Sequence, residues 1–383
     1  KPRASAAVRP TGEAMPHQRR QDARAASERS RTIARCELGE WDVPIECKRK
    51  LPCDLRTFDP GAAFNRKALA QATSRRWAEN NVDSPDRHFQ NGIEWWVHRA
   101  LPAAVSKPSD LDGASRIFIP AYFSYLFIFA PHKSDAAVHS IRTSLGRQWT
   151  DTPSRFVTAA GHPGACVRGT ESSKRLIVDT DMSCGGSKAP IAVPYVVSRP
   201  PWLVGTTLPP TNRSTFVFFR GHLPRAYIET KSVRRVLLKK LQGQPGVLIE
   251  AATSKPGAKY EPHSAYLQKL LGATFCLAPR GDTASSKRLY ESIAAGCIPV
   301  IISDSLVLPF ASRVRWDDFS IRVKESEALS DPIAMVNRLR AIPRQKVSQM
   351  SAALLAARPN FLWHLDPFRP NAVDQVLADM CAA

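Results

Sequence analysis

Three observations in the sequence predict an α/β fold built on parallel sheets. Beyond Thr215, short apolar runs alternate with amphipathic helical patterns, which is the succession expected of strands joined by crossover helices. Runs such as Cys297–Ser303 are continuously apolar, as are strands buried on both faces of a parallel sheet. The chain has 383 residues, 43% of them hydrophobic, so about two domains with ordinary cores are expected.

The second half of the chain shows its elements most clearly. Continuous apolar runs indicate the strands, and apolar residues at helical spacing indicate the helices between them. The predicted succession is strand 215–220, helix 225–241, strand 247–252, helix 263–271, strand 274–278, helix 285–295 and strand 298–303. Two short helical patterns rich in Ala, Leu and Arg follow Asp331 and should close this domain.

The first half of the chain is less regular. Its predicted strands are Ile117–Ile119, Leu176–Val178 and Tyr195–Val197. The segment Ser198–Ser214 contains four prolines and is the predicted interdomain linker. The predicted organisation is a basic, disordered stem or arm at 1–35, an N-terminal domain at 36–205 and a C-terminal domain at 206–383.

The loop after strand 274–278 has the character of a phosphate-binding site. Between this strand and the next helix lie Arg280, Gly281, Asp282, Thr283, Ala284, Ser285 and Ser286. Free backbone N–H groups and the positive end of a helix dipole point outward at such a place. Lys287 and Arg288 add full charges in the first helical turn. The pattern indicates recognition of a nucleotide pyrophosphate.

Glu291 lies one turn into the same predicted helix. A carboxylate there is repelled by phosphate, but it can accept hydrogen bonds from both hydroxyls of a ribose. Leu289 and Ile293, four residues apart, would pack on the sheet and leave Arg288 and Glu291 near the loop. The alternative is a structural turn, in which the serines only cap the helix and Arg288 and Glu291 form a surface ion pair.

The segment Phe275–Phe310 resembles the signature of the exostosin family, glycosyltransferase family 47. The shared features are an FCL strand, a PRG loop, an arginine and a glutamate on the next helix, a GCIPV strand and a later PF pair. The resemblance continues in Arg313–Glu325, Thr215–Gly221 and, more faintly, Arg116–Ser124. It covers most of residues 53–363.

This resemblance implies a GT-B fold, with two Rossmann-like domains facing a cleft: an acceptor-side domain at 36–205 and a nucleotide-sugar-binding domain at 206–383. It also implies an inverting transfer of sugar from a nucleotide donor to a glycan or glycoprotein acceptor. The donor would be UDP-linked, as in most members, and no metal or other cofactor is implied. Arg288 matches the family arginine near the diphosphate, and Glu291 the glutamate that holds the ribose. Arg220, followed by Gly221, matches the basic residue that closes the first strand of the donor domain. Since some exostosin-like enzymes work as heteromers, a hetero- or homo-oligomer is a further expectation.

Catalysis by inversion needs a base for the proton of the acceptor hydroxyl. Many exostosin relatives carry Asp-His-Phe about where this chain has Ser154, Arg155 and Phe156, so a familiar histidine is missing here. His162, in the turn Gly-His-Pro-Gly, is the nearest titratable substitute, and the alternative is an ordinary surface histidine. Arg288 is the second expected catalytic residue, because it would stabilise negative charge on the leaving diphosphate together with Arg280 and the loop amides.

One pattern in the sequence favours a metal site, against the expectation from the resemblance. Asp179-Thr180-Asp181 follows an apolar run, and this Asp-x-Asp pattern is how metal-dependent transferases hold Mg²⁺ or Mn²⁺ on a sugar nucleotide. Two aspartates also suit an ordinary turn. Because the downstream resemblance is to a metal-independent family, we expect no metal here.

The net charge of +20 predicts attraction to anions in general. Part of it lies in the first 35 residues, which hold nine Lys or Arg against three acidic residues. The sequence contains no nucleic-acid recognition module, so no nucleic-acid partner is expected. Two alternatives to a transferase remain: a non-catalytic nucleotide-sugar or glycan-binding protein on the same scaffold, and a polyanion-binding protein.

The expected location is the Golgi lumen. No run approaches the roughly eighteen apolar residues of a membrane span, since Ile117–Pro131 is interrupted by Pro120. Exostosin-like enzymes usually lie behind an N-terminal signal anchor and a stem, and the basic arm resembles such a stem. The chain begins without an anchor, so an upstream segment is expected to be absent or removed. The sequon at Asn212 also favours a lumenal location.

The chain has eight cysteines without zinc-ligand spacing. Cys276 and Cys297 would lie on adjacent parallel strands, where a disulfide or two reduced core thiols would both fit. The exostosin resemblance implies the disulfide. No partners are predicted for Cys36, Cys47, Cys53, Cys166, Cys184 and Cys381.

Overall fold

A computed structural model gives the fold of the chain. It describes residues 50–68, 92–162, 164–165, 168–179, 190–197, 212–223, 232–252, 263–364 and 369–382. The predicted arm, residues 1–35, lies outside the described residues, as does most of the predicted linker.

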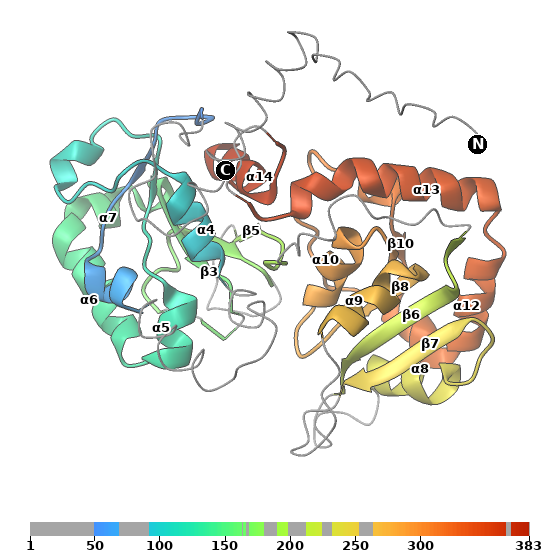
Figure 1. Cartoon of the computed structure of the whole chain (residues 1–383). Coiled ribbons are helices and arrows are strands. Elements are labelled where there is room, and N and C mark those ends of the chain that lie inside the picture. Colours follow the sequence, from blue (N-terminus) through green and yellow to red (C-terminus); the bar gives the residue numbers. More distant parts are fainter. Residues whose placement is uncertain are drawn as a thin grey trace, which may run out of the picture.

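The N-terminal domain is built on a parallel sheet of five strands in the order β1-β2-β3-β4-β5 (Figure 1). The strands are β1 (Leu55–Thr57), β2 (Arg116–Phe118), β3 (Phe156–Ala160), β4 (Lys174–Ile177) and β5 (Pro190–Ala192). The helices are α4 (Ile93–Ala100), α5 (Phe123–Phe129), α6 (Lys133–Leu145) and α7 (Arg147–Asp151), with short 3-10 turns η2 (Ala62–Phe64), η3 (Pro108–Leu111) and η4 (Pro153–Arg155).

The C-terminal domain has a second parallel sheet of five strands, in the order β10-β9-β8-β6-β7. The strands are β6 (Thr215–His222), β7 (Val247–Ala252), β8 (Ala273–Pro279), β9 (Ile298–Ile302) and β10 (Ile321–Arg322). β6 pairs with β7 on one side and with β8 on the other, so the direction of strand addition reverses between β6 and β8. Ligands of open α/β sheets bind outside the carboxyl ends of strands at such a switch point.

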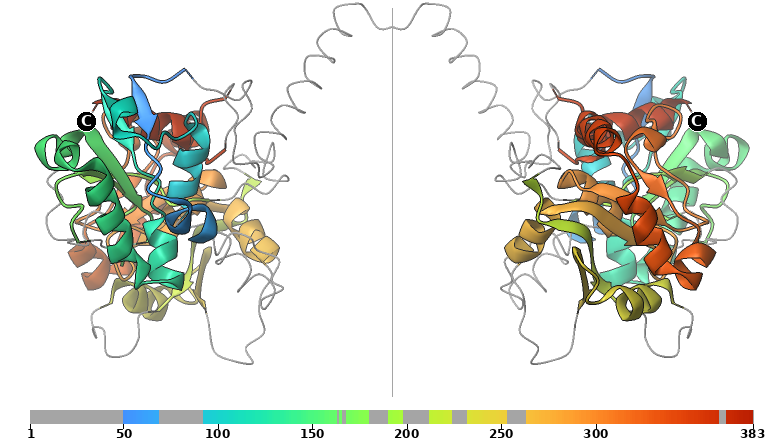
Figure 2. Two further views of the ribbon diagram at one scale, coloured as in Figure 1. Left: turned by 90° about the vertical axis from the view of Figure 1, so that its left-hand side faces the viewer. Right: turned by 90° about the vertical axis from the view of Figure 1, so that its right-hand side faces the viewer.

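Helices and short turns complete the C-terminal domain, which faces the viewer in the right-hand view of Figure 2. They are α8 (Val233–Leu241), α9 (His263–Leu271), α10 (Lys287–Ala294), η7 (Trp316–Asp318), α11 (Glu325–Ser330), α12 (Pro332–Arg340), α13 (Arg344–Ala357), η8 (Arg358–Phe361) and α14 (Ala372–Ala382).

Alternating side chains of the C-terminal sheet form two cores. Val217 and Phe219 of β6 and Phe275 of β8 join the large hydrophobic cluster on one face. Phe218 and Cys276 join a smaller cluster with α9 on the other face. Every residue of β8 and β9 is buried, as the continuous apolar runs in the sequence predict.

The predicted strands and helices of the C-terminal domain are confirmed, with β7 and α9 at the predicted bounds. The helix predicted at 225–241 is described from Val233 onward, and residues 225–231 lie outside the described residues. The strand predicted at Tyr195–Val197 is wrong, because β5 lies at Pro190–Ala192 and the chain has left the sheet before Tyr195. The strands β1 and β3 and the helix α14 were not predicted. Each of these strands has at most five residues, too few for a clear periodic signal.

The last helix, α14, connects the two domains (Figure 1). Arg313 Nη1 of the C-terminal domain lies 2.7 Å from Asp379 Oδ1, and Arg116 Nε of β2 donates to the carbonyl oxygen of Met380 at 3.0 Å. A disulfide joins Cys381 to Cys53. Two parallel α/β domains in one chain are the GT-B architecture that the sequence predicts. No helix in the described ranges is both long and apolar enough to cross a bilayer.

Candidate functional site

Two chain segments meet at the carboxyl edge of the C-terminal sheet, at its switch point. β6 ends with Arg220, Gly221 and His222, and the neighbouring strand β8 is followed by the loop 280–286. Helix α10 begins directly after this loop, with Lys287 as its first residue. The N–H groups of its first turn therefore open beside the ends of both strands.

Arg288, in the first turn of α10, contacts the end of β6. Its Nε donates a hydrogen bond to the carbonyl oxygen of Arg220. Gly221 makes room for this contact, because a Cβ there would lie 2.9 Å from Arg288 Nε and 2.8 Å from Phe219 Cζ. Two residues predicted from separate motifs, Gly221 and Arg288, are thus coupled by packing.

Glu291 is buried one turn further along α10, with 7% of its surface exposed. The hydroxyl of Tyr266, on α9, donates to Glu291 Oε2 at 2.6 Å, and Lys287 Nζ lies 3.4 Å from Oε1. Burial and the Glu291 charge raise the pKa of Tyr266 well above its ordinary value, so its hydroxyl is a donor at neutral pH. The carboxylate is therefore held in one orientation from two sides.

The other two predicted arginines are loosely paired with acids. Arg220 Nε lies 3.9 Å from Glu250 Oε2, which is shared with Lys269, and Arg280 Nη1 lies 3.7 Å from Glu325 Oε1. Both guanidinium groups are partly exposed. Contacts of this length orient the cations without the short, paired hydrogen bonds of a tight bidentate pair.

The loop serines do not act as helix caps. Ser286 is the N-cap residue of α10, but its side chain makes no capping hydrogen bond. The hydroxyl of Ser285 is buried and has no hydrogen-bond partner. Arg288 and Glu291 do not pair with each other among the described contacts, because Arg288 bonds to Arg220 and Glu291 to Tyr266 and Lys287. The structural-turn alternative thus finds no support in these contacts.

The remaining loop residues differ in exposure. Asp282 is exposed, whereas Gly281 is half-buried. The N–H of Gly281 donates to the carbonyl oxygen of Thr283 at 2.9 Å, which closes a tight turn in the loop. A Cβ on Gly281 would lie 2.7 Å from Arg234 Nη2, so a side chain here would displace that guanidinium.

Arg234, on α8, is a buried cation that the sequence reasoning missed. Its Nη1 donates to the carbonyl oxygen of His222 at 2.9 Å, and its Nε to that of Arg280 at 2.8 Å. One guanidinium thereby joins the end of β6 to the start of the loop. Burial lowers its pKa to about 10, which still leaves it charged at neutral pH. One feature of the sequence could have indicated this. Arg234 is next to Val233 and three residues before Leu237, so it lies on the apolar, buried face of α8.

Asp179 reaches this loop from the N-terminal domain. It follows β4, is 4% exposed, and its Oδ2 accepts a hydrogen bond from the Ser285 N–H at 2.7 Å. Its partner in the Asp-x-Asp pattern, Asp181, lies outside the described residues. Within the part of the chain that the structure describes, no three His, Cys, Asp or Glu side chains are grouped to hold a metal ion.

His162 follows β3, the strand next to β4, and is half-buried. Its ring lies 4.9 Å from the Phe127 ring, centroid to centroid, and its Nδ1 accepts the Gly164 N–H at 3.0 Å. Burial lowers its pKa, so the ring is neutral at neutral pH. A neutral ring that accepts at Nδ1 carries its proton on Nε2, and this nitrogen is then a donor.

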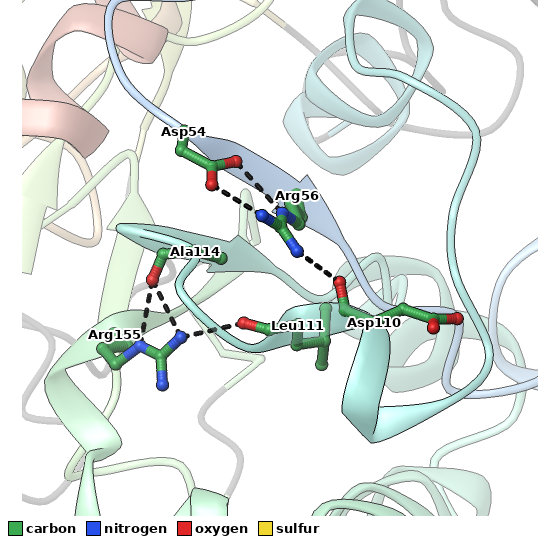
Figure 3. Close-up of polar contacts among 6 residues, drawn as sticks. All are labelled: Asp54, Arg56, Asp110, Leu111, Ala114 and Arg155. Atoms are coloured by element: carbon green, nitrogen blue, oxygen red, sulfur yellow. Dashed lines mark hydrogen bonds and ion pairs between the residues drawn. The ribbon is translucent and has the colours of Figure 1, made fainter.

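Arg155 lies at the opposite end of β3 (Figure 3). Its guanidinium donates to the carbonyl oxygens of Leu111 at 2.9 Å and Ala114 at 2.8 Å and 3.1 Å. Arg56 and Asp54 form a similar structural contact beside it. Ser154, Arg155 and Phe156 therefore lie at the amino edge of the sheet, whereas His162 lies at its carboxyl edge.

Glu94, on α4, is a fully buried carboxyl group that the sequence reasoning also missed. Its Oε1 accepts the Ser124 N–H at 2.8 Å, and Ser124 Oγ accepts the His162 N–H at 2.9 Å. Burial raises the pKa of Glu94 to about 7. The chain of bonds from Glu94 through Ser124 fixes the backbone that carries His162.

A family model for the exostosin GT47 domain matches residues 61–339. The chain belongs to the exostosin GT47 family. A Physcomitrium patens member named as a probable glucuronosyltransferase is 32% identical over 304 residues, or 70% of this chain and 65% of the relative. A rice member with a similar name is 28% identical over 349 residues, or 81% of this chain and 78% of the relative. Arabidopsis members are named as arabinosyl- and β-1,4-xylosyltransferases.

The matches cover from 58% to 78% of the length of four rice relatives of the exostosin GT47 family. Among solved structures, Anabaena Alr3699/HepE in complex with UDP and glucose aligns at 8% identity with a TM-score of 0.40. That alignment covers 86% of this chain and 99% of the other. A likeness this low carries no argument about the site.

The disulfide that the exostosin resemblance implies, between Cys276 and Cys297, is present. The bridge between Cys53 and Cys381 was not predicted, since 328 positions separate the two cysteines. Cys36, Cys47, Cys166 and Cys184 lie outside the described residues. Asn212 of the sequon is exposed just before β6.

Proposed function

We propose that this exostosin GT47 protein is an inverting glycosyltransferase that moves a sugar from a UDP-linked donor to a hydroxyl of a glycan acceptor. The observation that carries the proposal is the placement of Arg288 and Glu291 one turn apart on α10. Both lie at the switch point between β6 and β8, and both are held by contacts from other elements. This is the arrangement that a nucleoside diphosphate requires: a cation at the phosphates and a fixed acceptor at the ribose.

The diphosphate would lie at the N-terminus of α10. The N–H groups of its first turn, the helix dipole and the side chains of Lys287 and Arg288 would face it. Arg280 and Arg220, at the ends of β8 and β6, would add positive charge beside it. These groups would stabilise the charge that develops on the leaving UDP, and the proposal requires no metal cofactor.

Glu291 would accept hydrogen bonds from the ribose hydroxyls. Its Oε2 is oriented by Tyr266 and its Oε1 by Lys287, so the carboxylate would present its oxygen acceptors to the ribose in a fixed direction. Because the carboxylate is fixed before the nucleotide binds, little orientation entropy is lost on binding. The donor sugar would be a hexose or pentose or their acid form; the names of the relatives refer to a hexuronic acid and two pentoses.

The acceptor hydroxyl must give its proton to a group on the N-terminal domain. His162 and Asp179 follow the adjacent strands β3 and β4, at the carboxyl edge of that sheet. Because the relatives are named as glycosyltransferases, the proposed acceptor is a glycan, and no nucleic-acid partner is proposed. The assembly to test is a hetero- or homo-oligomer.

We also propose that the protein works in an oxidising compartment, the Golgi lumen. Two disulfides and an exposed asparagine in a sequon support this location, because such bonds persist where thiols are not kept reduced. Membrane attachment would then need a segment outside the described residues.

A donor screen tests the proposal. UDP should raise the melting temperature of the protein, and one sugar nucleotide of a panel should release UDP when an oligosaccharide acceptor is added. A stabilising shift without UDP release from any donor would indicate a binding protein. Binding of polyanions that needs no nucleotide and is lost at moderate salt would indicate the polyanion-binding alternative.

A further inference from the structure

Asp179 connects the two domains at the point where the proposed transfer would occur. Its Oδ2 is 2.7 Å from the Ser285 N–H, and the pairing joins residues 106 positions apart. Asp179 belongs to the N-terminal domain and Ser285 to the loop 280–286 of the C-terminal domain, so this hydrogen bond crosses from one domain to the other. The inference below rests on the proposed function.

The position suits a base for an inverting reaction. Ser285 precedes the first residue of α10 by two positions, a span of about 7 Å at most. A phosphate bound by the first-turn N–H groups would thus lie about one sugar ring from Asp179. In an in-line displacement, the base, the acceptor oxygen and the anomeric carbon occupy that space in this order.

Two other titratable groups in the described part of the N-terminal domain, His162 and Glu94, are less suited. His162 accepts the Gly164 N–H at Nδ1, so Nε2 carries the proton, and protonating Nδ1 would break that bond. Glu94 is fully buried, and its Oε1 is held by the Ser124 N–H. Asp179 is also buried, with 4% of its surface exposed, but its carboxylate contacts the donor loop directly.

We propose that Asp179 is the catalytic base of the transfer. Its carboxylate takes the proton of the acceptor hydroxyl while the acceptor oxygen bonds to the anomeric carbon. At the same time the bond from this carbon to the β-phosphate oxygen breaks, and its electron pair leaves with UDP. A carboxylate has about four lone-pair sites, so the bond from Ser285 is compatible with this role.

The substitution Asp179→Asn tests this role, because the amide oxygen can still accept the Ser285 N–H while the base is lost. With the donor and acceptor found in the screen, kcat should fall about 10²- to 10⁴-fold. The Kd for UDP, measured by calorimetry, should stay within about threefold of the wild-type value, since no UDP contact is removed. Asp331→Asn is the matched control, because Asp331 also accepts a backbone N–H, that of Ala334, at 2.9 Å, but on the far helix α12. It should leave kcat unchanged.

Two results would overturn the inference. One is a kcat for Asp179→Asn within about tenfold of the wild type. The other is a loss of activity matched by an equal loss of UDP affinity, which would make Asp179 a positioning residue for the loop. If Asp179→Asn does not fold, the smaller Asp179→Ser is judged by the same two criteria. Failure of the proposed function would look different, because the wild-type protein itself would then neither bind UDP nor release it.

Discussion

The hydroxyl of Tyr266 donates a 2.6 Å hydrogen bond to Glu291 Oε2, so α9 orients a carboxylate that belongs to α10. Tyr266→Phe removes the hydroxyl that makes this bond and should weaken UDP binding about fivefold, because a hydrogen bond to a charged group contributes about 1 kcal/mol or more. Calorimetric titration with UDP measures the change.

The control for this variant is a phenol outside the site. Tyr125→Phe alters a buried tyrosine in the N-terminal domain, whose hydroxyl has no hydrogen-bond partner. It should leave the Kd for UDP unchanged. Equal affinities for Tyr266→Phe and the wild type would show that the tyrosine does not orient the nucleotide ligand.

Gly221 has a packing role that predicts a coupled loss of stability and binding. The Cβ of Gly221→Ala would lie under 3 Å from Phe219 and Arg288, and Phe219 is too tightly buried to move. The free energy of unfolding should fall by about 1–3 kcal/mol, and UDP affinity should fall because Arg288 is displaced. Denaturant unfolding and calorimetry measure the two effects.

Gly272→Ala is the matched control for this glycine. Its Cβ would meet Gln268 O at 3.4 Å, an ordinary contact, and it lies away from the loop. A Gly221→Ala protein with wild-type affinity for UDP would rule out the coupling between Gly221 and Arg288.

Glu94 should make stability depend on pH. Its pKa is about 7 in the folded chain against 4.5 as the ordinary value, so between these values the folded state binds more protons than the unfolded state. The contribution of this group to stability therefore falls as pH rises from 4.5 to 7, by on the order of 3 kcal/mol in total. Glu94→Gln should gain stability relative to the wild type by about this amount between pH 5 and pH 8.

Urea unfolding of both proteins across this pH range measures the difference. His98, whose pKa burial lowers to about 4, has the opposite slope, but it is present in both proteins and cancels in the comparison. A difference in stability that stays constant with pH would mean that Glu94 is already charged in the folded state.

The disulfide between Cys53 and Cys381 should stabilise the docking of α14. The double variant Cys53→Ser, Cys381→Ser should lose about 2–4 kcal/mol of unfolding free energy, because the bridge constrains the unfolded chain. Thermal unfolding measures the loss, after mass spectrometry has confirmed the bridge in the wild type. An unchanged melting temperature would show that the ion pair of Arg313 with Asp379 suffices to dock the helix.

Local patterns predicted the C-terminal domain well. The fully buried strands β8 and β9 are continuous apolar runs, and the loop between them stands out by its small and charged residues. The same reasoning could not find the contacts that depend on tertiary structure. The bond from Ser285 to Asp179 joins two domains, and Arg234 acts through two carbonyl groups that carry no sequence signal.

The positions of Arg155 and His162 also could not be predicted from local patterns. The sequence placed the altered Asp-His-Phe position near the expected base, since only six residues separate Phe156 from His162. These residues span β3, so they lie at opposite edges of the sheet. Strand direction, which the sequence did not reveal here, decides which of them faces the loop.

Titration of UDP into the wild type and into Arg288→Ala and Glu291→Ala tests the central claim most directly. The account predicts that UDP binds the wild type and that either substitution weakens binding at least tenfold while the protein stays folded. Glu327→Gln, a change on α11 that alters a surface ion pair with Arg338 of α12, is the control and should bind UDP as the wild type does. Equal UDP affinity for the wild type, Arg288→Ala and Glu291→Ala would contradict the account.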